Sequence, residues 1–484
     1  MITKWGLKKF KSIRETELEL APLTILTGVN SSGKSSFLQS IAMLAQSAKN
    51  NGDITINGNL VNMVHFNQIF CQNIFQDETD DVWNTIGVNF TISPVGSINK
   101  NICLEFEYGF FNNATRIQHS KLIPPKFLSF YMESKEGETG DDTVYVKYHR
   151  DEGTSFDPAS YNEIKNNLPQ YRDKTPDSFK LDILLSRENK LHDEETPNFL
   201  PEKIKISRNE SVEMPPKLKE ARDYLHEYLG SKVKYLGPLR QEPQYGYDRL
   251  EHYEDVDARG INTAAVIDYM CKKGSVKRYI TPEVKDFNEK EKEHFSSALY
   301  EWIKYILFDD NFSIDFNIQE LQSKKIKFKI YSDGGGFFLN QLGTGVTWIL
   351  PILVMCLAAE PDSTIIIQQP EEHLHPKVQS RLADFFIAMA LSGRQCLIET
   401  HSEYLIEQLR YRIVKSPIEN PLHDKVKLYF VTKRDGVSFY KDMEIDEFAA
   451  PSDWPEDFFD ESHILANKIM DESIKKKKSG RRHE

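Results

Sequence analysis

Residues 23–36 read Leu-Thr-Ile-Leu-Thr-Gly-Val-Asn-Ser-Ser-Gly-Lys-Ser-Ser, a short segment in which three kinds of local structure follow one another. The run 23–27 is apolar and rich in β-formers, and it predicts a buried strand. Residues 28–35 fit the pattern G-x-x-x-x-G-K-S without a gap. From residue 36 to residue 45, apolar side chains recur at helical spacing. Strand, glycine-rich loop and helix in this order are typical of a phosphate-binding loop.

The chemistry of this loop follows from its residue types. Gly28 and Gly33 allow tight backbone turns, so that successive N–H groups can converge on phosphate oxygens, and the helix that follows adds its positive dipole end. Lys34 can reach the β and γ phosphates, and the Ser35 hydroxyl can hold Mg²⁺. The alternative, a glycine-rich turn without a ligand, is disfavoured because loop and flanks agree. The residues predicted to bind nucleotide here are Gly28, Asn30, Ser31, Ser32, Gly33, Lys34, Ser35 and Ser36.

Composition restricts the class of protein. The chain of 484 residues is long enough for about two or three domains. Its formal net charge of −12 disfavours a generic nucleic-acid binder, so that DNA contact would need a local basic patch or a partner. The 5 cysteines include no C-x-x-C pair, which argues against a zinc module and suits a reducing compartment. No stretch approaches the roughly 20 apolar residues of a membrane span, so we expect a cytoplasmic protein with no membrane partner.

Strand patterns flank the loop on both sides. Residues 2–10 and 16–20 predict two antiparallel strands before it, with Lys11 and Ser12 in the turn between them. We expect Lys11 and Ser12 to lie near the nucleotide; the alternative is a solvated turn lysine. Strand-like runs between residues 54 and 149 predict an antiparallel β-subdomain, in which Gln68 is a candidate weak Mg²⁺ ligand.

Residues 150–310 differ in character from both ends of the chain. The first part is polar, and 218–229, 261–273 and 284–308 read as helices, which predicts an inserted, mainly helical lobe and an interaction region. The strand-like run 233–236 precedes Arg240. We expect Arg240 to reach a phosphate, to reach a partner subunit, or to pair with a carboxylate, and the sequence leaves these alternatives open.

The last third of the chain carries a second set of candidate site residues. Gly343, Thr344 and Gly345 precede an apolar helix at 348–359, where they can offer N–H groups to an anion. The buried strand 364–367 ends in Gln368 and Gln369.

Two amides at the end of this strand change the chemistry that it can perform. At this point a Walker B strand usually has an acid for Mg²⁺ and then a catalytic glutamate. Gln368 can coordinate Mg²⁺ only weakly, and Gln369 can hold a water but cannot accept its proton as a carboxylate would. Glu371 or Glu372 is the alternative base. A metal pair formed by His373 and His375 is disfavoured, because no further ligands cluster there.

His401 follows the next short strand, 395–399. We predict that its side chain hydrogen-bonds the γ-phosphate and orients water. The alternative is a simple helix start, for which Ser402 is a suitable N-cap. Both roles are compatible. The predicted catalytic residues are therefore Gln369, Glu371 and His401.

These motifs together resemble the ABC-type ATPases that are grouped with SMC, RecF and OLD proteins. Two further segments resemble a bacterial AAA-family subgroup with an interrupted head, similar to the PtuA-type ATPases of Septu anti-phage systems. The resemblance covers both ends of the chain well and residues 50–230 poorly. The segments that carry it are LTGVNSSGKSS at 26–36, LGTGV at 342–346, QPEEHLHP at 369–376, ETHSEYL at 399–405, YLGPLR at 235–240 and WPEDFFD at 454–460.

The resemblance implies an α/β fold of the ABC-type ATPase head, with a mixed sheet, flanking helices and an antiparallel β-subdomain. The expected division is an N-terminal ATPase lobe at 1–149, the inserted lobe at 150–310, a C-terminal ATPase lobe at 311–460, and a terminal helix with a basic tail at 461–484. It also implies ATP and Mg²⁺ as cofactors. In a nucleotide-sandwich homodimer or higher homo-oligomer, the 343–345 segment of one chain would face the phosphate loop of the other.

The same resemblance implies a function in defence. PtuA-like ATPases work with a separate HNH nuclease of the PtuB type, and contact with DNA would then come through the complex. The residues after His401 show no cluster of acids on strand ends, so we expect no nuclease activity in this chain. Gln368 is either a natural loss of the usual acid or a substitution that traps ATP, and under both alternatives we expect slow or absent hydrolysis. The competing hypothesis is a RecF- or SMC-like DNA-repair ATPase that clamps DNA.

Overall fold

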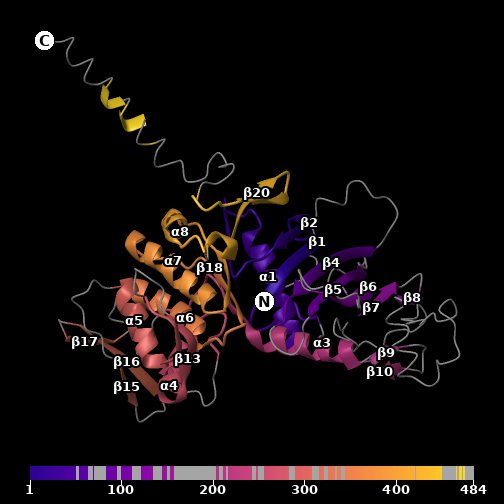
Figure 1. Ribbon diagram of the computed structural model, residues 1–484, viewed down its shortest axis with the longest axis horizontal. Helices are drawn as coiled ribbons and strands as arrows, with labels where there is room; N and C mark the ends of the chain where they lie inside the picture. The colour runs from indigo at the N-terminus through magenta and orange to yellow at the C-terminus, as the bar shows by residue number, and fades with distance from the viewer. Residues whose placement is uncertain are drawn as a thin grey trace.

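A computed structural model gives the fold (Figure 1). The residues that it describes are 1–50, 54–63, 69, 83–94, 100–111, 121–134, 144–149, 153–156, 203–205, 211–213, 216–242, 247–248, 255–282, 289–307, 316–320, 325–332, 335–338, 344–419, 421–449, 465, 468–470 and 472–474.

A six-stranded sheet forms the centre of the molecule, in the order β11-β18-β19-β3-β20-β21. Neighbouring strands run parallel except β20 and β21, which form an antiparallel hairpin at one edge. Every residue of β18 and β19 is buried, as expected for parallel strands covered on both faces. The strands are β3 (Leu23–Gly28), β11 (Val233–Leu236), β18 (Thr364–Gln368), β19 (Gln395–Glu399), β20 (Val426–Arg434) and β21 (Val437–Asp442).

The register of this sheet brings three strand ends together. Gln368, the last residue of β18, pairs with Glu399, the last residue of β19. Glu399 in turn pairs with Leu26 of β3, two residues before Gly28. The carboxyl ends of the three strands therefore meet at one edge, which is where ligands bind in open α/β sheets.

Alternating side chains of the central strands enter two different hydrophobic cores, because successive residues of a strand point to opposite faces. Leu26, Ile366 and Leu397 pack with α1 and the segment α3–η5. Ile25 and Ile398 enter the second core with α4–α8, which lie on the side away from the antiparallel sheet (Figure 1). The helices are α1 (Lys34–Lys49), α3 (Pro216–Glu227), the π-helix η5 (Tyr228–Lys232), α4 (Thr263–Lys273), α5 (Phe295–Leu307), α6 (Thr344–Ala358), α7 (Pro376–Leu391), α8 (Glu403–Lys415) and the 3-10 turn η7 (His423–Lys425).

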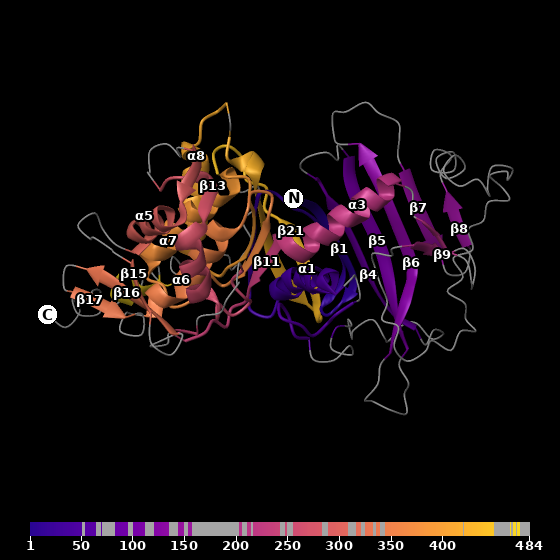
Figure 2. The same cartoon turned by 90° about the horizontal axis from the view of Figure 1, so that it is seen from below.

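The predicted antiparallel β-subdomain is confirmed as a seven-stranded sheet, in the order β2-β1-β4-β5-β6-β7-β8. Figure 2 shows α3 crossing one face of this sheet. Trp5 of β1 stacks on Phe90 of β4 with ring centroids 5.0 Å apart, and its indole N–H donates to Ser40 Oγ of α1 at 2.9 Å. The strands are β1 (Ile2–Phe10), β2 (Ile13–Glu19), β4 (Trp83–Ile92), β5 (Lys100–Phe111), β6 (Lys121–Ser134), β7 (Val144–His149) and β8 (Gly153–Phe156).

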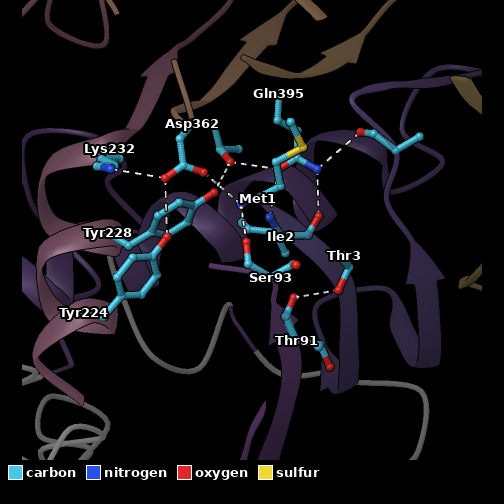
Figure 3. Close-up of polar contacts among 12 residues, drawn as sticks. Met1, Ile2, Thr3, Thr91, Ser93, Tyr224, Tyr228, Lys232, Asp362 and Gln395 are labelled. Atoms are coloured by element: carbon cyan, nitrogen blue, oxygen red, sulfur yellow. Dashed lines mark hydrogen bonds and ion pairs between the residues drawn. The ribbon is translucent and has the colours of Figure 1, made fainter. Parts of the chain in front are cut away.

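Asp362, just before β18, joins the N-terminal strand and the α3–η5 segment to the central sheet (Figure 3). Its carboxylate accepts from Lys232 Nζ at 3.1 Å, from the Tyr224 hydroxyl at 3.3 Å and from the Met1 amino nitrogen at 3.3 Å. Gln395 of β19 adds a second link, because its amide nitrogen donates to the carbonyl of Ile2 at 2.6 Å. These contacts fix the antiparallel sheet against the strands that carry the site.

Smaller sheets complete the described structure. One is the pair β9 with β10, one is the pair β13 with β14, and the third contains β12, β15, β16 and β17. Their strands are β9 (Lys203–Lys205), β10 (Ser211–Glu213), β12 (Tyr247–Asp248), β13 (Ser275–Ile280), β14 (Glu289–His294), β15 (Phe316–Glu320), β16 (Lys325–Ser332) and β17 (Gly335–Phe338).

The structure departs from the sequence prediction in two places. The helix predicted at 284–308 begins only at Phe295, because residues 289–294 pair with β13 as a strand. Lys290 lies over the Tyr279 ring and Glu289 pairs with Arg278 across this hairpin, contacts that override the helix-forming tendency of Glu and Lys. In addition, β11 lies in the central sheet although its residues fall within the range expected for an inserted lobe.

The segment 454–460 and the basic tail after residue 474 lie outside the described residues. Within the described part of the chain, no helix has the length and apolar character needed to span a bilayer.

A buried ion pair connects α7 to α8. Arg412 donates to Asp384 at 2.6 and 2.8 Å, and Tyr305 and Gln408 also donate to this carboxylate. Because both charged side chains are almost fully buried, Asp384→Asn leaves Arg412 without its counter-charge. We expect the free energy of unfolding to fall by about 3–5 kcal/mol.

Denaturant unfolding measures this effect. Glu407→Gln is the matched control, because it breaks an exposed ion pair with Arg410 on the same helix and should cost at most about 0.5 kcal/mol. Equal losses in the two variants would contradict the structural role of the buried pair.

Candidate functional site

The loop after β3 has the backbone of a phosphate-binding loop. Gly28 has φ 132° and Gly33 has φ 113°, backbone conformations that residues with a side chain rarely adopt. A Cβ atom on Gly28 would lie 2.1 Å from the Val431 carbonyl oxygen, and one on Gly33 would lie 2.3 Å from Ser438 Oγ. Both glycines of the motif are therefore required by the geometry.

Strand β21 supports this loop from the side. The Tyr440 hydroxyl donates to the Gly33 carbonyl at 2.8 Å, and Ser438 Oγ lies 2.6 Å from Ser12 Oγ. Ser12 therefore lies against the loop, and its predicted role at a bound nucleotide stays a prediction. Lys11 instead donates to Gln39 of α1 at 2.8 Å, and burial lowers its pKa. The sequence analysis missed Ser438 and Tyr440, because no local pattern links them to the loop; Tyr440 lies 407 positions after Gly33.

The Lys34 ammonium lies inside the loop. It donates to the carbonyl oxygens of Gly28 at 3.0 Å and Val29 at 2.7 Å. Burial lowers its pKa, and the nearby carboxylates Glu399 and Glu371 oppose that shift. The residue therefore places a positive charge at the point where the motif predicts phosphate.

Four side chains form a hydrogen-bonded chain beside Lys34, and all but Ser35 are buried. Tyr235 OH donates to Gln368 Oε1 at 2.6 Å, and Gln368 Nε2 donates to Glu399 Oε2 at 2.6 Å. Ser35 Oγ donates to Glu399 Oε1 at 2.7 Å. Burial raises the pKa of Glu399. The sequence analysis missed Glu399, although an acid directly after the apolar run 396–398 was a visible signal.

Glu371 holds the backbone that leads to His401. Its carboxylate accepts from the His401 N–H at 2.6 Å and from the Thr400 hydroxyl at 2.8 Å, and burial raises its pKa. The His401 ring hydrogen-bonds the Gly28 backbone, and burial together with Lys34 lowers its pKa to about 4. His401 is therefore a neutral imidazole at pH 7 beside the phosphate loop. The predicted cap is confirmed, because Ser402 Oγ accepts from the Leu405 N–H at 3.1 Å.

Arg240 stabilises the segment after β18. Its guanidinium donates to the carbonyl oxygens of Gln368 at 3.0 Å and Gln369 at 3.1 Å, and it lies 5.6 Å from the centroid of the Trp348 ring. Burial lowers its pKa to about 10. Gln369 has φ 47°, so Arg240 holds a residue in a left-handed conformation. The roles expected for Arg240 from the sequence were contact with a phosphate, with a partner subunit or with a carboxylate, and they did not include these backbone carbonyls.

Residues 344–345, at the start of α6, lie against the segment that follows β18. A Cβ atom on Gly345 would be 3.3 Å from the His373 carbonyl, and the Trp348 ring meets the His373 ring at 4.6 Å. His375 caps α7, because its Nδ1 accepts from the Lys377 N–H at 3.2 Å. Thr344 begins α6. Gly343 and Gln68 lie outside the described residues, so their predicted roles stay predictions.

The fold and this site define an α/β ATPase domain with a phosphate-binding loop: a strand and loop surround a lysine, with a buried acid and a neutral histidine at the same sheet edge. The chain belongs to the AAA ATPase domain family, whose model matches residues 1–406. Residues 422–469 match a second family model, described as a protein of unknown function (DUF3696). No curated protein matches the chain.

Solved structures similar to the chain include three SMC heads. The SMC head domain from Thermotoga maritima has 12% identity and a TM-score of 0.38, covering 92% of this chain and 99% of that chain. An SMC head bound to the C-terminal winged-helix domain of ScpA has 11% identity and a TM-score of 0.42, covering 92% and 98%. An SMC head from Pyrococcus furiosus with an extended coiled coil, bound to the C-terminal domain of ScpA, has 11% identity and a TM-score of 0.41, covering 97% and 99%.

Proposed function

We propose that the chain is the ATP-binding subunit of an anti-phage defence complex, in which nucleotide-sandwich dimers hold and gate a separate HNH nuclease. The observation that carries the ATP-binding part is the convergence of Lys34, Ser35, Glu399 and His401 at one sheet edge. Support for the defence part comes from the segments at 235–240 and 454–460 that resemble PtuA-type ATPases.

Binding of ATP would use the loop that the structure shows. Lys34 would exchange the carbonyl oxygens of Gly28 and Val29 for phosphate oxygens, and α1 would direct the positive end of its dipole at them. The remaining loop residues, from Asn30 to Ser36, would supply N–H and hydroxyl groups. His401, neutral and adjacent to Gly28, would hydrogen-bond the γ-phosphate.

Families of this class bind nucleotide with a divalent metal, usually Mg²⁺. The Ser35 hydroxyl and the carboxylate bonded to it are hard oxygen ligands of the kind that Mg²⁺ takes, so the residues present fit such an ion. When bound, the ion would neutralise charge on the β- and γ-phosphate oxygens.

Two copies of the chain would complete each site. The N-terminus of α6 and Gly345 lie against His373, on the segment that follows β18. In a sandwich dimer, Thr344 and Gly345 would offer backbone N–H groups to the γ-phosphate held by the other copy. We propose the range 150–310 as the region that meets the nuclease, since the ATPase motifs do not account for most of it.

The geometry also supports slow hydrolysis. Gln369 carries no carboxylate, and both oxygens of Glu371 already accept hydrogen bonds from Thr400 and His401. We therefore expect steady-state ATP turnover far below the order of 10 s⁻¹ that is common for enzymes. A phosphate-release assay on the purified chain measures this. Turnover of about 10 s⁻¹ that disappears in Lys34→Ala would contradict slow hydrolysis.

DNA binding separates this proposal from a repair clamp. With a net charge of −12, the chain alone should bind duplex DNA weakly and with little dependence on ATP. Fluorescence anisotropy with labelled DNA at several salt concentrations tests this expectation. Tight, salt-sensitive binding by the chain alone that requires ATP would favour the clamp.

A further inference from the structure

The end of β18 carries an amide where a Walker B strand usually carries an acid, and the end of the neighbouring strand β19 carries a carboxylate. The amide is that of Gln368, and the carboxylate is that of Glu399. The two residues pair directly in the parallel register. Adjacent strands lie about 4.8 Å apart, so a side chain from either strand can reach the same point beyond the sheet edge.

Glu399 accepts a hydrogen bond from Ser35, whose hydroxyl is the predicted Mg²⁺ ligand of the phosphate loop. Ser35 Oγ donates to Glu399 Oε1 at 2.7 Å, although 364 positions separate the two residues in the sequence. The side chain is only 2% exposed. Among the described residues, the hydrogen bonds to this carboxylate come from two neutral groups, Ser35 and Gln368. The Lys34 ammonium is the nearby positive charge, and a buried carboxylate whose hydrogen-bond partners are neutral favours such a charge beside it.

The amide of Gln368 faces the carboxylate with its donor end. Its oxygen accepts from Tyr235 OH at 2.6 Å, which directs its nitrogen towards Glu399 Oε2 at 2.6 Å. The Tyr235 hydroxyl also hydrogen-bonds Gln39 of α1. An acid at position 368 would instead put two carboxylates side by side, and like charges at this distance oppose ionisation of both.

We propose that Glu399 supplies the carboxylate ligand of the divalent cation at the ATP site, together with Ser35. In this arrangement Gln368 is a positioning residue, which orients the Glu399 carboxylate through its amide nitrogen. The acid that would hold the ion then lies at the end of β19, next to the end of β18 where a Walker B strand usually carries it. This inference rests on the proposed binding of ATP.

The test uses Mn²⁺ as a paramagnetic probe of the full-length protein with ADP. Free Mn²⁺, measured by electron paramagnetic resonance, gives the affinity of the ion for the nucleotide complex. Nucleotide affinity is measured separately in EDTA with a fluorescent ADP analogue. Glu399→Gln keeps the shape of the side chain: its amide oxygen can still accept from Gln368 Nε2, and its amide nitrogen can donate to Ser35 Oγ. We expect it to weaken Mn²⁺ binding at least ~10-fold, while nucleotide affinity in EDTA stays within ~2-fold.

A second variant exchanges the two side chains. Gln368→Glu combined with Glu399→Gln places the acid on β18, and we expect this double variant to bind Mn²⁺ within ~3-fold of the parent affinity. Gln368→Leu removes only the orienting amide, and we expect it to weaken Mn²⁺ binding ~10-fold. Circular dichroism and the thermal midpoint verify that each variant is folded. If Glu399→Gln unfolds, the comparison rests on the exchanged pair and Gln368→Leu.

Several outcomes would overturn the inference. If folded Glu399→Gln binds Mn²⁺ as tightly as the parent protein, the inference is wrong, while the proposal of ATP binding is unaffected. The same holds if the exchanged pair fails to bind Mn²⁺ but still binds nucleotide in EDTA. Failure of the parent protein to bind any nucleotide in EDTA would overturn the proposed function, and this inference with it.

Discussion

Lys34→Ala is expected to lower the affinity of the chain for ATP at least about 100-fold, which corresponds to about 2.7 kcal/mol of binding free energy. The ammonium is almost fully buried within the loop, where it contacts the Gly28 and Val29 carbonyl oxygens that it would release on binding phosphate. Charge-assisted hydrogen bonds are roughly twice as strong as neutral ones, and the alanine variant offers none of them. Titration calorimetry with ATP and Mg²⁺ measures the loss.

Lys49→Ala is the matched control, because Lys49 is the exposed last residue of the same helix, α1. It removes an identical charge at the end far from the loop, so ATP affinity should stay within about 2-fold. If Lys34→Ala binds ATP as tightly as Lys49→Ala, the loop is not the nucleotide site.

Gln369→Glu is expected to raise ATP turnover by about 100-fold over the parent protein. The backbone here is already fixed, because the Gln369 N–H donates to the Glu399 carbonyl at 2.8 Å and its own carbonyl accepts from Arg240. A carboxylate in that position could accept the proton of the attacking water, which the amide cannot do. Phosphate release under saturating ATP measures the gain.

Gln379→Glu is a suitable control for added charge, because Gln379 lies on α7 and contacts Leu374 and Ser402 rather than the loop. It should leave turnover within about 2-fold. Unchanged turnover in Gln369→Glu, with ATP affinity intact, would show that the catalytic base lies elsewhere, and Glu371 would then be the first alternative.

The phosphate loop could be predicted from the sequence because its signal is local. A strand, two glycines at fixed spacing and a helix lie within about two dozen residues, and each reinforces the others. The antiparallel subdomain and the helix cap at Ser402 were predictable for the same reason. The central strands were visible in the sequence as apolar runs.

The partners of the loop could not be predicted, because they depend on strand order. Glu399 meets Ser35 only because β19 lies between β18 and β3, and Tyr440 meets Gly33 only because β21 closes the sheet beside β20. Residues 289–294 were misassigned for a related reason. Their charged composition suits a helix, but pairing with β13 decides their conformation.

The most direct test of the account is the native mass of the complex, purified from its own host through a tag on this chain, in the presence and in the absence of ATP. The account predicts an even number of copies of this chain with bound nucleotide and a small nuclease in fixed ratio. A single copy without nucleotide, or a bare dimer that retains DNA only in ATP, would contradict it.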